Sequence, residues 1–171
     1  EERAEPRQYR RDFEILAKIG DGASAEVFRA RNKTFGMIVA LKVWRRPLAP
    51  DRRGAFLHEC RLHWRLSNED NIVRLLWAEG TAGQPPWMAT ELYEEGSLAD
   101  RLRTEPPLSA DQAYLIADDI LSGLAAVHRA DHLHRDLKPA NVLLRNNRAA
   151  LCDLGISTAI GEPAGDKAAG T

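Results

Sequence analysis

The sequence has few of the residues that define several large classes of protein. Only 2 of its 171 residues are cysteines, Cys60 and Cys152, and they have neither CxxC nor Cys/His spacing. This excludes a disulfide-stapled scaffold and favours two reduced, buried thiols over a disulfide or a structural zinc site. No apolar run approaches the roughly 20 residues of a membrane span, and the charged start of the chain is unlike a signal peptide. We therefore predict a soluble, cytoplasmic protein.

An excess of charge of either sign is also missing. Lys and Arg together number 24 and Asp and Glu 25, which leaves a net charge of −1, and 44% of the residues are hydrophobic. This balance is typical of a soluble globular protein and gives no electrostatic basis for binding nucleic acid. Residues 1–11 are charged and have little to bury, so we predict a solvated leader or linker there.

The apolar residues that follow have the periodicity of strands. Alternating or continuous apolar runs separated by turn-forming residues predict strands at 13–20, 25–31, 37–44, 72–79 and 87–92. One segment, 52–66, instead places apolar residues three and four apart and predicts a helix.

Helical periodicity dominates after Ser97. Ser109 and Gln112 have the spacing of a capping box, and we predict a long helix from there to about Ala130. Its apolar stripe consists of Ala113, Ile116, Ile120, Leu124 and Val127. Residues 142–144 and 149–151 are predicted to form a hairpin, because Asn146 and Asn147 between them tolerate positive φ. Residues 156–171 have no periodicity and are predicted to be a loop.

Gly20 and Gly22 lie in a turn between two predicted strands. Glycines at this spacing allow a backbone to approach phosphates closely, although such a sequence also occurs in ordinary turns. Because a strand follows the turn, the sequence does not fit a dinucleotide-binding fingerprint, in which a helix follows.

Lys42 and Glu59 are charged residues in apolar surroundings. Lys42 lies in an apolar strand, and Glu59 shares the apolar face of the 52–66 helix. Burying either charge alone would cost several kcal/mol, so an ion pair between them is one interpretation. The residues alone leave two others open, in which the lysine extends to a sheet edge or the glutamate lies at the margin of the helix face.

The most specific pattern is in the second half of the chain. Residues 134–141 read HRDLKPAN, and twelve positions after Asn141 the sequence continues Asp153-Leu154-Gly155. These residues, after a glycine-rich turn and a strand lysine, match the catalytic-loop and D-x-G signatures of protein kinases. From about Asp12 to Thr171 the sequence resembles a eukaryotic-type (Hanks-type) serine/threonine protein kinase catalytic domain.

The resemblance implies an α+β, protein-kinase-like fold. Residues 12–95 would form the small nucleotide-binding lobe, a five-stranded antiparallel sheet with one main helix. Residues 96–171 would form a partial, helical large lobe with the catalytic loop and the start of the activation segment. The family's remaining large-lobe helices do not follow in this sequence, so we expect a partner chain or a further C-terminal segment to cover the apolar stripe of the 110–130 helix.

The resemblance also implies ATP and Mg²⁺ as cofactors and a protein Ser or Thr hydroxyl as the phosphate acceptor. Asp136 would accept the hydroxyl proton, Lys138 would stabilise the transferred phosphoryl group, and Lys42, held by Glu59, would bind the α- and β-phosphates. Asn141 and Asp153 would bind the metal. The residues implied to contact the nucleotide are Ile19, Gly20, Gly22, Val27, Ala40, Lys42, Thr90, Glu91, Tyr93 and Leu143.

Three positions depart from the family pattern. Ala25 replaces the third glycine of the turn, Leu154 replaces the D-x-G phenylalanine, and His63 replaces an apolar residue of the helix that carries Glu59. The histidine suggests pH-sensitive positioning of that helix. Two other functions remain open: a pseudokinase or truncated nucleotide-binding scaffold that acts through a partner, and a small-molecule phosphotransferase of the antibiotic-kinase type.

Asp153→Ala tests the metal assignment. The substitution removes a hard oxygen ligand, so Mg²⁺-dependent phosphotransfer should be abolished while the fold is retained. Phosphotransfer assays beside circular dichroism spectra measure both effects, and wild-type turnover in the variant would refute the assignment.

Overall fold

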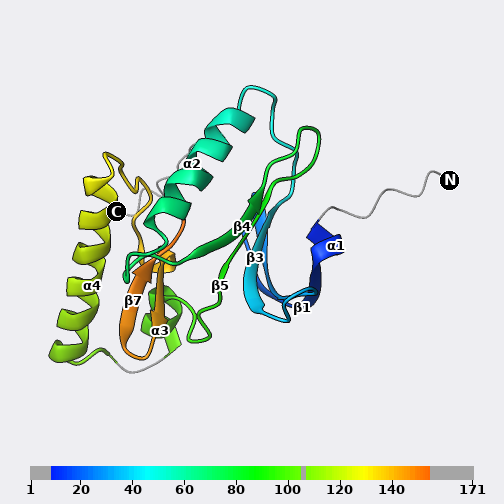
Figure 1. Cartoon of the computed structure of the whole chain (residues 1–171). Coiled ribbons are helices and arrows are strands. Elements are labelled where there is room, and N and C mark those ends of the chain that lie inside the picture. The colour runs from blue at the N-terminus through cyan, green and yellow to red at the C-terminus, as the bar shows by residue number, and fades with distance from the viewer. Residues whose placement is uncertain (1–8, 105–106, 155–171) are drawn as a thin grey trace. The chain divides into compact units, whose positions relative to one another are not determined.

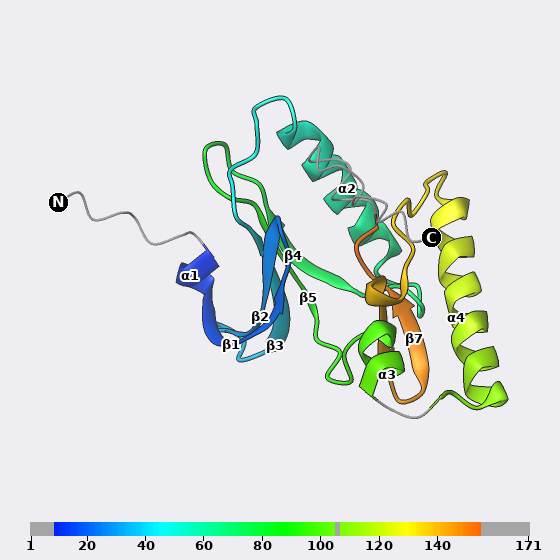
Figure 2. The same ribbon diagram turned by 180° about the vertical axis from the view of Figure 1, so that it is seen from behind.

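A computed structural model describes residues 9–104 and 107–154 of the chain, in which two units are recognised (Figures 1 and 2). The first comprises Glu1–Arg53 and Leu75–Leu92, and the second comprises Gly54–Arg74 and Tyr93–Thr171. The chain enters the second unit for the last time at Tyr93. The predicted loop 156–171 lies outside the described residues.

The first unit is an antiparallel sheet, as predicted. Its strands lie in the order β1-β2-β3-β5-β4. They are β1 (Phe13–Asp21), β2 (Ala25–Asn32), β3 (Ile38–Trp44), β4 (Leu75–Glu79) and β5 (Trp87–Glu91). All five predicted strands are present, but the fourth begins at Leu75 rather than Ile72. The reason is that Ile72 forms a parallel bridge with Leu151, and Val73 N–H donates to the Leu151 carbonyl at 2.9 Å.

The core of this unit follows the alternation of β3. Val39, Leu41 and Val43 are buried on one face, and Ile38, Ala40 and Lys42 are partly exposed on the other. The ring of Phe13 meets the rings of Trp77 and Trp87 edge to face in the same core, a favourable geometry for aromatic pairs.

The packed structure starts earlier than the predicted boundary at Asp12. A single helical turn, α1 (Tyr9–Asp12), precedes β1, and the side chain of Tyr9 is buried in the core of the first unit. Its neighbours Arg10 and Arg11 remain exposed. Burial of one aromatic ring outweighs the cost of ordering a charged turn, which composition alone did not indicate.

The second unit contains the helices that follow the third strand, and a hairpin. The helices are α2 (Arg53–Leu66), α3 (Leu98–Thr104), α4 (Ala110–Arg129) and the short 3-10 helix η1 (Pro139–Asn141), and the hairpin strands are β6 (Val142–Arg145) and β7 (Arg148–Leu151). The capping box of α4 is confirmed, since the Ser109 side chain accepts from Gln112 N–H and the Gln112 side chain accepts from Ser109 N–H. The hairpin turn is also confirmed, with φ of 52° at Asn146 and 59° at Asn147.

The apolar stripe of α4 packs against the hairpin. Ile116 and Val127 are buried in the core of the second unit, and Ile120 and Leu124 pack against that core. β7 lies beside α4 and covers part of this stripe (Figure 2), whereas Ala113 is exposed. Cover by a partner chain or a further segment stays a prediction. The exposed apolar side chains of α4, including Tyr114 and Leu121, belong to other faces of the helix.

None of the described helices combines the length and apolarity needed to cross a membrane.

A buried carboxylate joins α4 to β7. The Asp119 side chain, 3% exposed, accepts hydrogen bonds from Arg148 Nε at 2.9 Å, Arg148 Nη2 at 2.6 Å and Ala149 N–H at 2.8 Å. Burial acts to raise the pKa of Asp119, but the bonds from Arg148 and Ala149 outweigh it and hold that pKa below 3.8. The ionised form therefore stabilises the second unit.

Asp119→Asn should lower the free energy of unfolding by about 2 kcal/mol at pH 7, because it removes the charge that Arg148 and Ala149 N–H satisfy. Since the folded-state pKa is depressed, this contribution is present above the ordinary value of 3.8 and is lost as the pH falls through the folded-state pKa. Urea unfolding at several pH values measures the difference. The exposed neighbour Asp118→Asn is the matched control, and an equal effect in both variants would contradict the assignment.

Candidate active site

In the first unit, strand register aligns the residues implied to contact nucleotide. Gly20 pairs with Val27, and Val27 in turn pairs with Lys42, so the three residues form a row across β1, β2 and β3. Ala40 pairs with Thr90 on β5. A Cβ at position 20 would lie 3.2 Å from the Val27 Cβ, which explains a glycine there. The sheet thus collects residues that are distant in sequence.

Lys42 has an aromatic neighbour that the sequence interpretation missed. Its Nζ lies 5.1 Å from the centroid of the Trp44 ring, which is within cation–π range. A Lys-x-Trp sequence on one strand places both side chains on the same face, and this spacing is the signal that would have found the contact. Because Lys42 belongs to the first unit and Glu59 to the second, an ion pair between them stays a prediction.

The remaining residues implied to contact nucleotide are Ile19, Thr90, Glu91, Tyr93 and Leu143. Ile19 is half exposed on β1, and Thr90 Oγ1 donates to the Glu91 carbonyl at 3.2 Å. In the second unit the Arg145 guanidinium lies 4.0 Å from the Tyr93 ring centroid, and Leu143 forms a bridge with Ser97. Tyr93 and Leu143 are thus ordered by contacts within their own unit.

The second unit brings the catalytic-loop side chains together around one carboxylate. Lys138 Nζ donates to Asp136 Oδ2 at 2.7 Å, and Asn141 Nδ2 donates to the same oxygen at 2.9 Å and to the Asp136 carbonyl at 2.8 Å. Asn141 is buried, whereas the side chains of Lys138 and Asp136 are 49% and 36% exposed. A buried amide therefore orients a carboxylate that remains accessible.

The backbone on either side of this cluster is strained. Arg135 has φ of 62° in a tight turn closed by a 2.8 Å hydrogen bond from Asp136 N–H to the His134 carbonyl, and Asp153 has φ of 57°. Non-glycine residues adopt this region rarely and at a cost of about 1–3 kcal/mol, most often at functional sites. The strain is located at Asp153 and at Arg135, the residue directly before Asp136.

Two buried side chains anchor the strained segments. His134 is 3% exposed and Leu154 is 1% exposed. Burial lowers the pKa of His134, although the carboxylates of Asp153 and Asp136 act in the opposite direction. Leu154, which replaces the phenylalanine of the family motif, belongs to the core of the second unit and so packs as an apolar anchor there.

Asn141 and Asp153, the residues implied to bind metal, are brought together by the backbone. Cys152 N–H donates to the Asn141 carbonyl at 3.0 Å, and Asp153 is the next residue. Because Asn141 Nδ2 donates to Asp136, the amide oxygen Oδ1 is the atom that would face a cation. An amide oxygen and a carboxylate are hard ligands, so this donor set fits Mg²⁺.

Glu59 contacts a histidine that the sequence interpretation also missed. Its side chain is 11% exposed, and Oε2 lies 3.1 Å from His132 Nε2. The same nitrogen lies 3.3 Å from the Leu154 carbonyl oxygen. Nothing in the spacing of the sequence connects residues 59 and 132, so only the tertiary structure reveals this contact.

His63, one of the predicted departures, is buried in α2. Its Nε2 lies 2.7 Å from the Val73 carbonyl, which can only accept a hydrogen bond, so this nitrogen carries a proton and donates. The imidazole thus links the helix to the segment that follows it. The proposed pH sensitivity of this helix stays a prediction.

The sheet, the catalytic-loop cluster and the adjacent Asn141 and Asp153 define a protein kinase domain. The sequence profile of the family described as protein kinase domain matches residues 13–171, and the chain belongs to this family. It is 32% identical over 150 residues to human mitogen-activated protein kinase kinase kinase kinase 3, covering 87% of this chain and 16% of that protein.

Two bacterial relatives are similar at the same level. Serine/threonine-protein kinase PknK of Mycobacterium tuberculosis is 33% identical over 150 residues, which cover 87% of this chain and 14% of PknK. Serine/threonine-protein kinase PknL of the same organism is 32% identical over 149 residues, which cover 85% of this chain and 37% of PknL. The chain thus resembles serine/threonine kinases and spans well under half the length of these relatives.

The thiol of Cys60, the residue after Glu59, has a pKa that depends on burial and on the charge of Glu59. Burial, together with the charge of Glu59, raises the pKa of the Cys60 thiol from 9.0 to about 12. Since the thiolate is the reactive form, alkylation by iodoacetamide at pH 8 should be at least about a hundredfold slower in the folded than in the urea-unfolded protein. Mass spectrometry of the labelled peptide measures this rate, and equal rates in both states would contradict the buried environment.

Proposed function

We propose that this chain is part of the catalytic domain of an ATP- and Mg²⁺-dependent serine/threonine protein kinase, which transfers the γ-phosphoryl group of ATP to Ser or Thr hydroxyls of proteins in the cytoplasm. The observation that carries the proposal is the convergence of Lys138 and Asn141 on the carboxylate of Asp136. Serine/threonine kinases are also the relatives to which the chain is similar.

Asp136 would orient the substrate hydroxyl and accept its proton. A base for this step needs an accessible carboxylate in a defined orientation, since phosphoryl transfer depends on positioning more than on a strong nucleophile. The amide of Asn141 supplies that orientation, because it donates to both the carboxylate and the backbone carbonyl of Asp136. Partial exposure leaves the carboxylate reachable by a protein substrate.

Lys138 and Lys42 would neutralise negative charge at different points of the nucleotide. Lys138, whose Nζ already lies 2.7 Å from Asp136 Oδ2, is close enough to the proposed base to contact the transferred phosphoryl group. Lys42 would bind the α- and β-phosphates, with Glu59 as its partner. Gly20, Gly22 and Val27 would cover the nucleotide, and Ala40, Thr90 and Leu143 would line the adenine site.

Asn141 and Asp153 would hold Mg²⁺, which when bound shields the charge of the phosphates. Their side-chain oxygens are hard ligands, and the hydrogen bond from Cys152 N–H to the Asn141 carbonyl keeps the two residues adjacent. The positive φ of Asp153 supports the same role, because strained backbone of this kind persists where function requires a particular side-chain direction.

Asp136→Asn tests the proposal in the protein that carries this chain. The asparagine cannot accept the hydroxyl proton, so kcat for phosphorylation of a protein substrate should fall about a thousandfold. The stabilisation of the protein by Mg-ATP, measured by thermal shift, should be retained. Asp131→Asn is the matched control, since Asp131 is exposed in the same segment at φ of 55°, which asparagine tolerates.

The outcomes separate the kinase from its alternative. Phosphotransfer by the wild type and by Asp131→Asn, lost in Asp136→Asn, supports the proposal. A wild-type protein that is stabilised by Mg-ATP but transfers no phosphate is instead a nucleotide-binding pseudokinase. Wild-type turnover in Asp136→Asn would refute the role of this carboxylate.

A further inference from the structure

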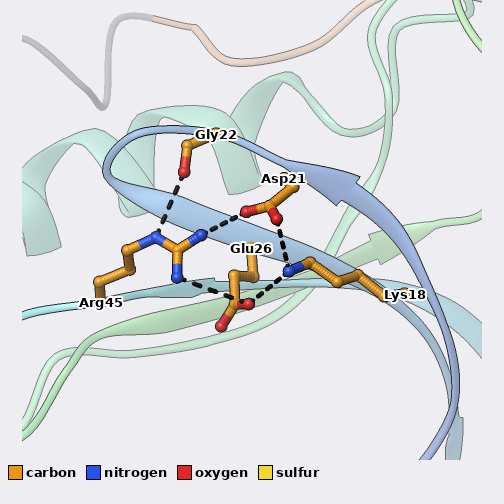
Figure 3. Close-up of polar contacts among 5 residues, drawn as sticks. All are labelled: Lys18, Asp21, Gly22, Glu26 and Arg45. Carbon is orange, nitrogen blue, oxygen red and sulfur yellow. Dashed lines mark hydrogen bonds and ion pairs between the residues drawn. The ribbon is translucent and has the colours of Figure 1, made fainter.

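Four charged side chains, of which Glu26 is partly buried and the other three are exposed, form a closed ring at the glycine-rich turn of the first unit. Figure 3 shows Lys18, Asp21, Arg45 and Glu26 contacting one another in alternating order of charge. Lys18 Nζ lies 2.7 Å from both Asp21 Oδ2 and Glu26 Oε1. Arg45 pairs with Asp21 and lies 3.5 Å from Glu26 Oε1.

The ring joins every backbone segment that meets at the turn. Lys18 and Asp21 lie on β1, Glu26 lies on β2, and Arg45 directly follows β3. Each of the two carboxylates contacts both cations, so the relative positions of the three segments depend on four contacts rather than on one ion pair. A network of this kind restricts a turn more than one exposed ion pair does.

Arg45 also binds the backbone of the turn itself. Its Nε donates to the Gly22 carbonyl at 3.3 Å, and its backbone N–H donates to the Ser24 carbonyl at 2.8 Å. In a trans peptide the carbonyl of one residue and the N–H of the next point in opposite directions. The N–H of Ala23 is therefore directed away from the Arg45 side chain.

This orientation of the backbone carbonyl and N–H groups suits a turn that covers phosphates. Backbone N–H groups attract an anion and carbonyl oxygens repel it, so a phosphate-covering turn needs its carbonyls engaged elsewhere. Arg45 engages two of them. Ala25 stands where the family motif has its third glycine, and Gly22 packs tightly, since a Cβ there would lie 3.3 Å from the Ala25 carbonyl. There is thus little space beside Gly22 within the turn, and the contacts of Arg45 hold the turn from outside.

We propose that Arg45 is a positioning residue for nucleotide binding, which acts through the ring with Lys18, Asp21 and Glu26 to hold the glycine-rich turn in its phosphate-binding shape. The inference rests on the proposed function, because it assumes that this turn covers a nucleotide. It assigns no catalytic role to Arg45, whose side chain contacts the turn and the two carboxylates.

The protonation of the ring agrees with this role. Hydrogen bonds from Lys18 lower the pKa of Asp21 and of Glu26, and hydrogen bonds to Asp21 and Glu26 raise the pKa of Lys18. These shifts favour the charged forms of Lys18, Asp21 and Glu26 at neutral pH. Since the side chains of Lys18, Arg45 and Asp21 are well exposed, the ring should respond to ionic strength.

Arg45→Gln tests the proposal with a matched control at the other end of the same hairpin. Arg31 also pairs across β1 and β2, with Glu14 at 3.2 Å, but far from the turn. In 50 mM KCl the dissociation constant for Mg-ATP should rise about fivefold in Arg45→Gln and stay at the wild-type value in Arg31→Gln. The value of kcat at saturating ATP should be close to that of the wild type in both variants.

Salt and a double-mutant cycle distinguish the ring from a general loss of stability. The difference between Arg45→Gln and the wild type should shrink toward none in about 0.5 M KCl, because salt screens exposed charges. Glu26→Gln should weaken binding as well, and the double variant should lose less than the sum of the two single losses. Unchanged affinity in Arg45→Gln, or an equal loss in Arg31→Gln, would overturn the proposal.

Hydrogen exchange keeps this inference separate from the proposed function. Without nucleotide, the amides of residues 20–27 should exchange faster in Arg45→Gln than in the wild type or in Arg31→Gln, since the ring orders the turn by itself. If the wild type binds no Mg-ATP, the proposed function fails and so does the positioning role. If the wild type binds it but the turn exchanges equally in all three proteins, only the ring's role is overturned.

Discussion

The backbone hydrogen bond from Cys152 N–H to the Asn141 carbonyl is the constraint on which the candidate active site of the second unit depends. This bond joins the two ends of the β6–β7 hairpin. The residue before β6 is Asn141, at the end of the catalytic-loop motif, and the residue after β7 is Cys152, which precedes Asp153. With Asn141 held in this way, its amide reaches Asp136, and Lys138 donates to the same carboxylate oxygen. This main-chain contact keeps Asn141, whose amide binds Asp136, beside the residue that precedes Asp153.

A buried residue flanks each of the two strained positions of this arrangement. Arg135 and Asp153 adopt positive φ, which is unfavourable for their residue types. Each adjoins a nearly fully buried residue, His134 in one case and Leu154 in the other. Because burial leaves the side chains of His134 and Leu154 little freedom, the strained residues next to them cannot relax easily.

Charge has different physical roles at the two polar networks. Asp119 is buried against Arg148 and Ala149 N–H, where removing its charge leaves donors unsatisfied, so it fastens α4 to β7. The ring of Lys18, Asp21, Glu26 and Arg45 is largely exposed, where each pair contributes little and salt weakens it. The first network suits permanent structure, and the second suits the role that we propose for the turn, which is to cover a nucleotide.

The sequence by itself determined the five strands, the capped helix α4, the Asn-Asn hairpin and the catalytic-loop motif, because alternation, capping and turn chemistry are local properties. Only the tertiary structure decided the contacts between distant positions. Strand register places Gly20, Val27 and Lys42 in one row, and the core of the first unit buries Tyr9. Ile72 pairs with Leu151 instead of extending β4, and His132 contacts Glu59. Such contacts depend on how whole elements pack, and no spacing within one segment encodes them.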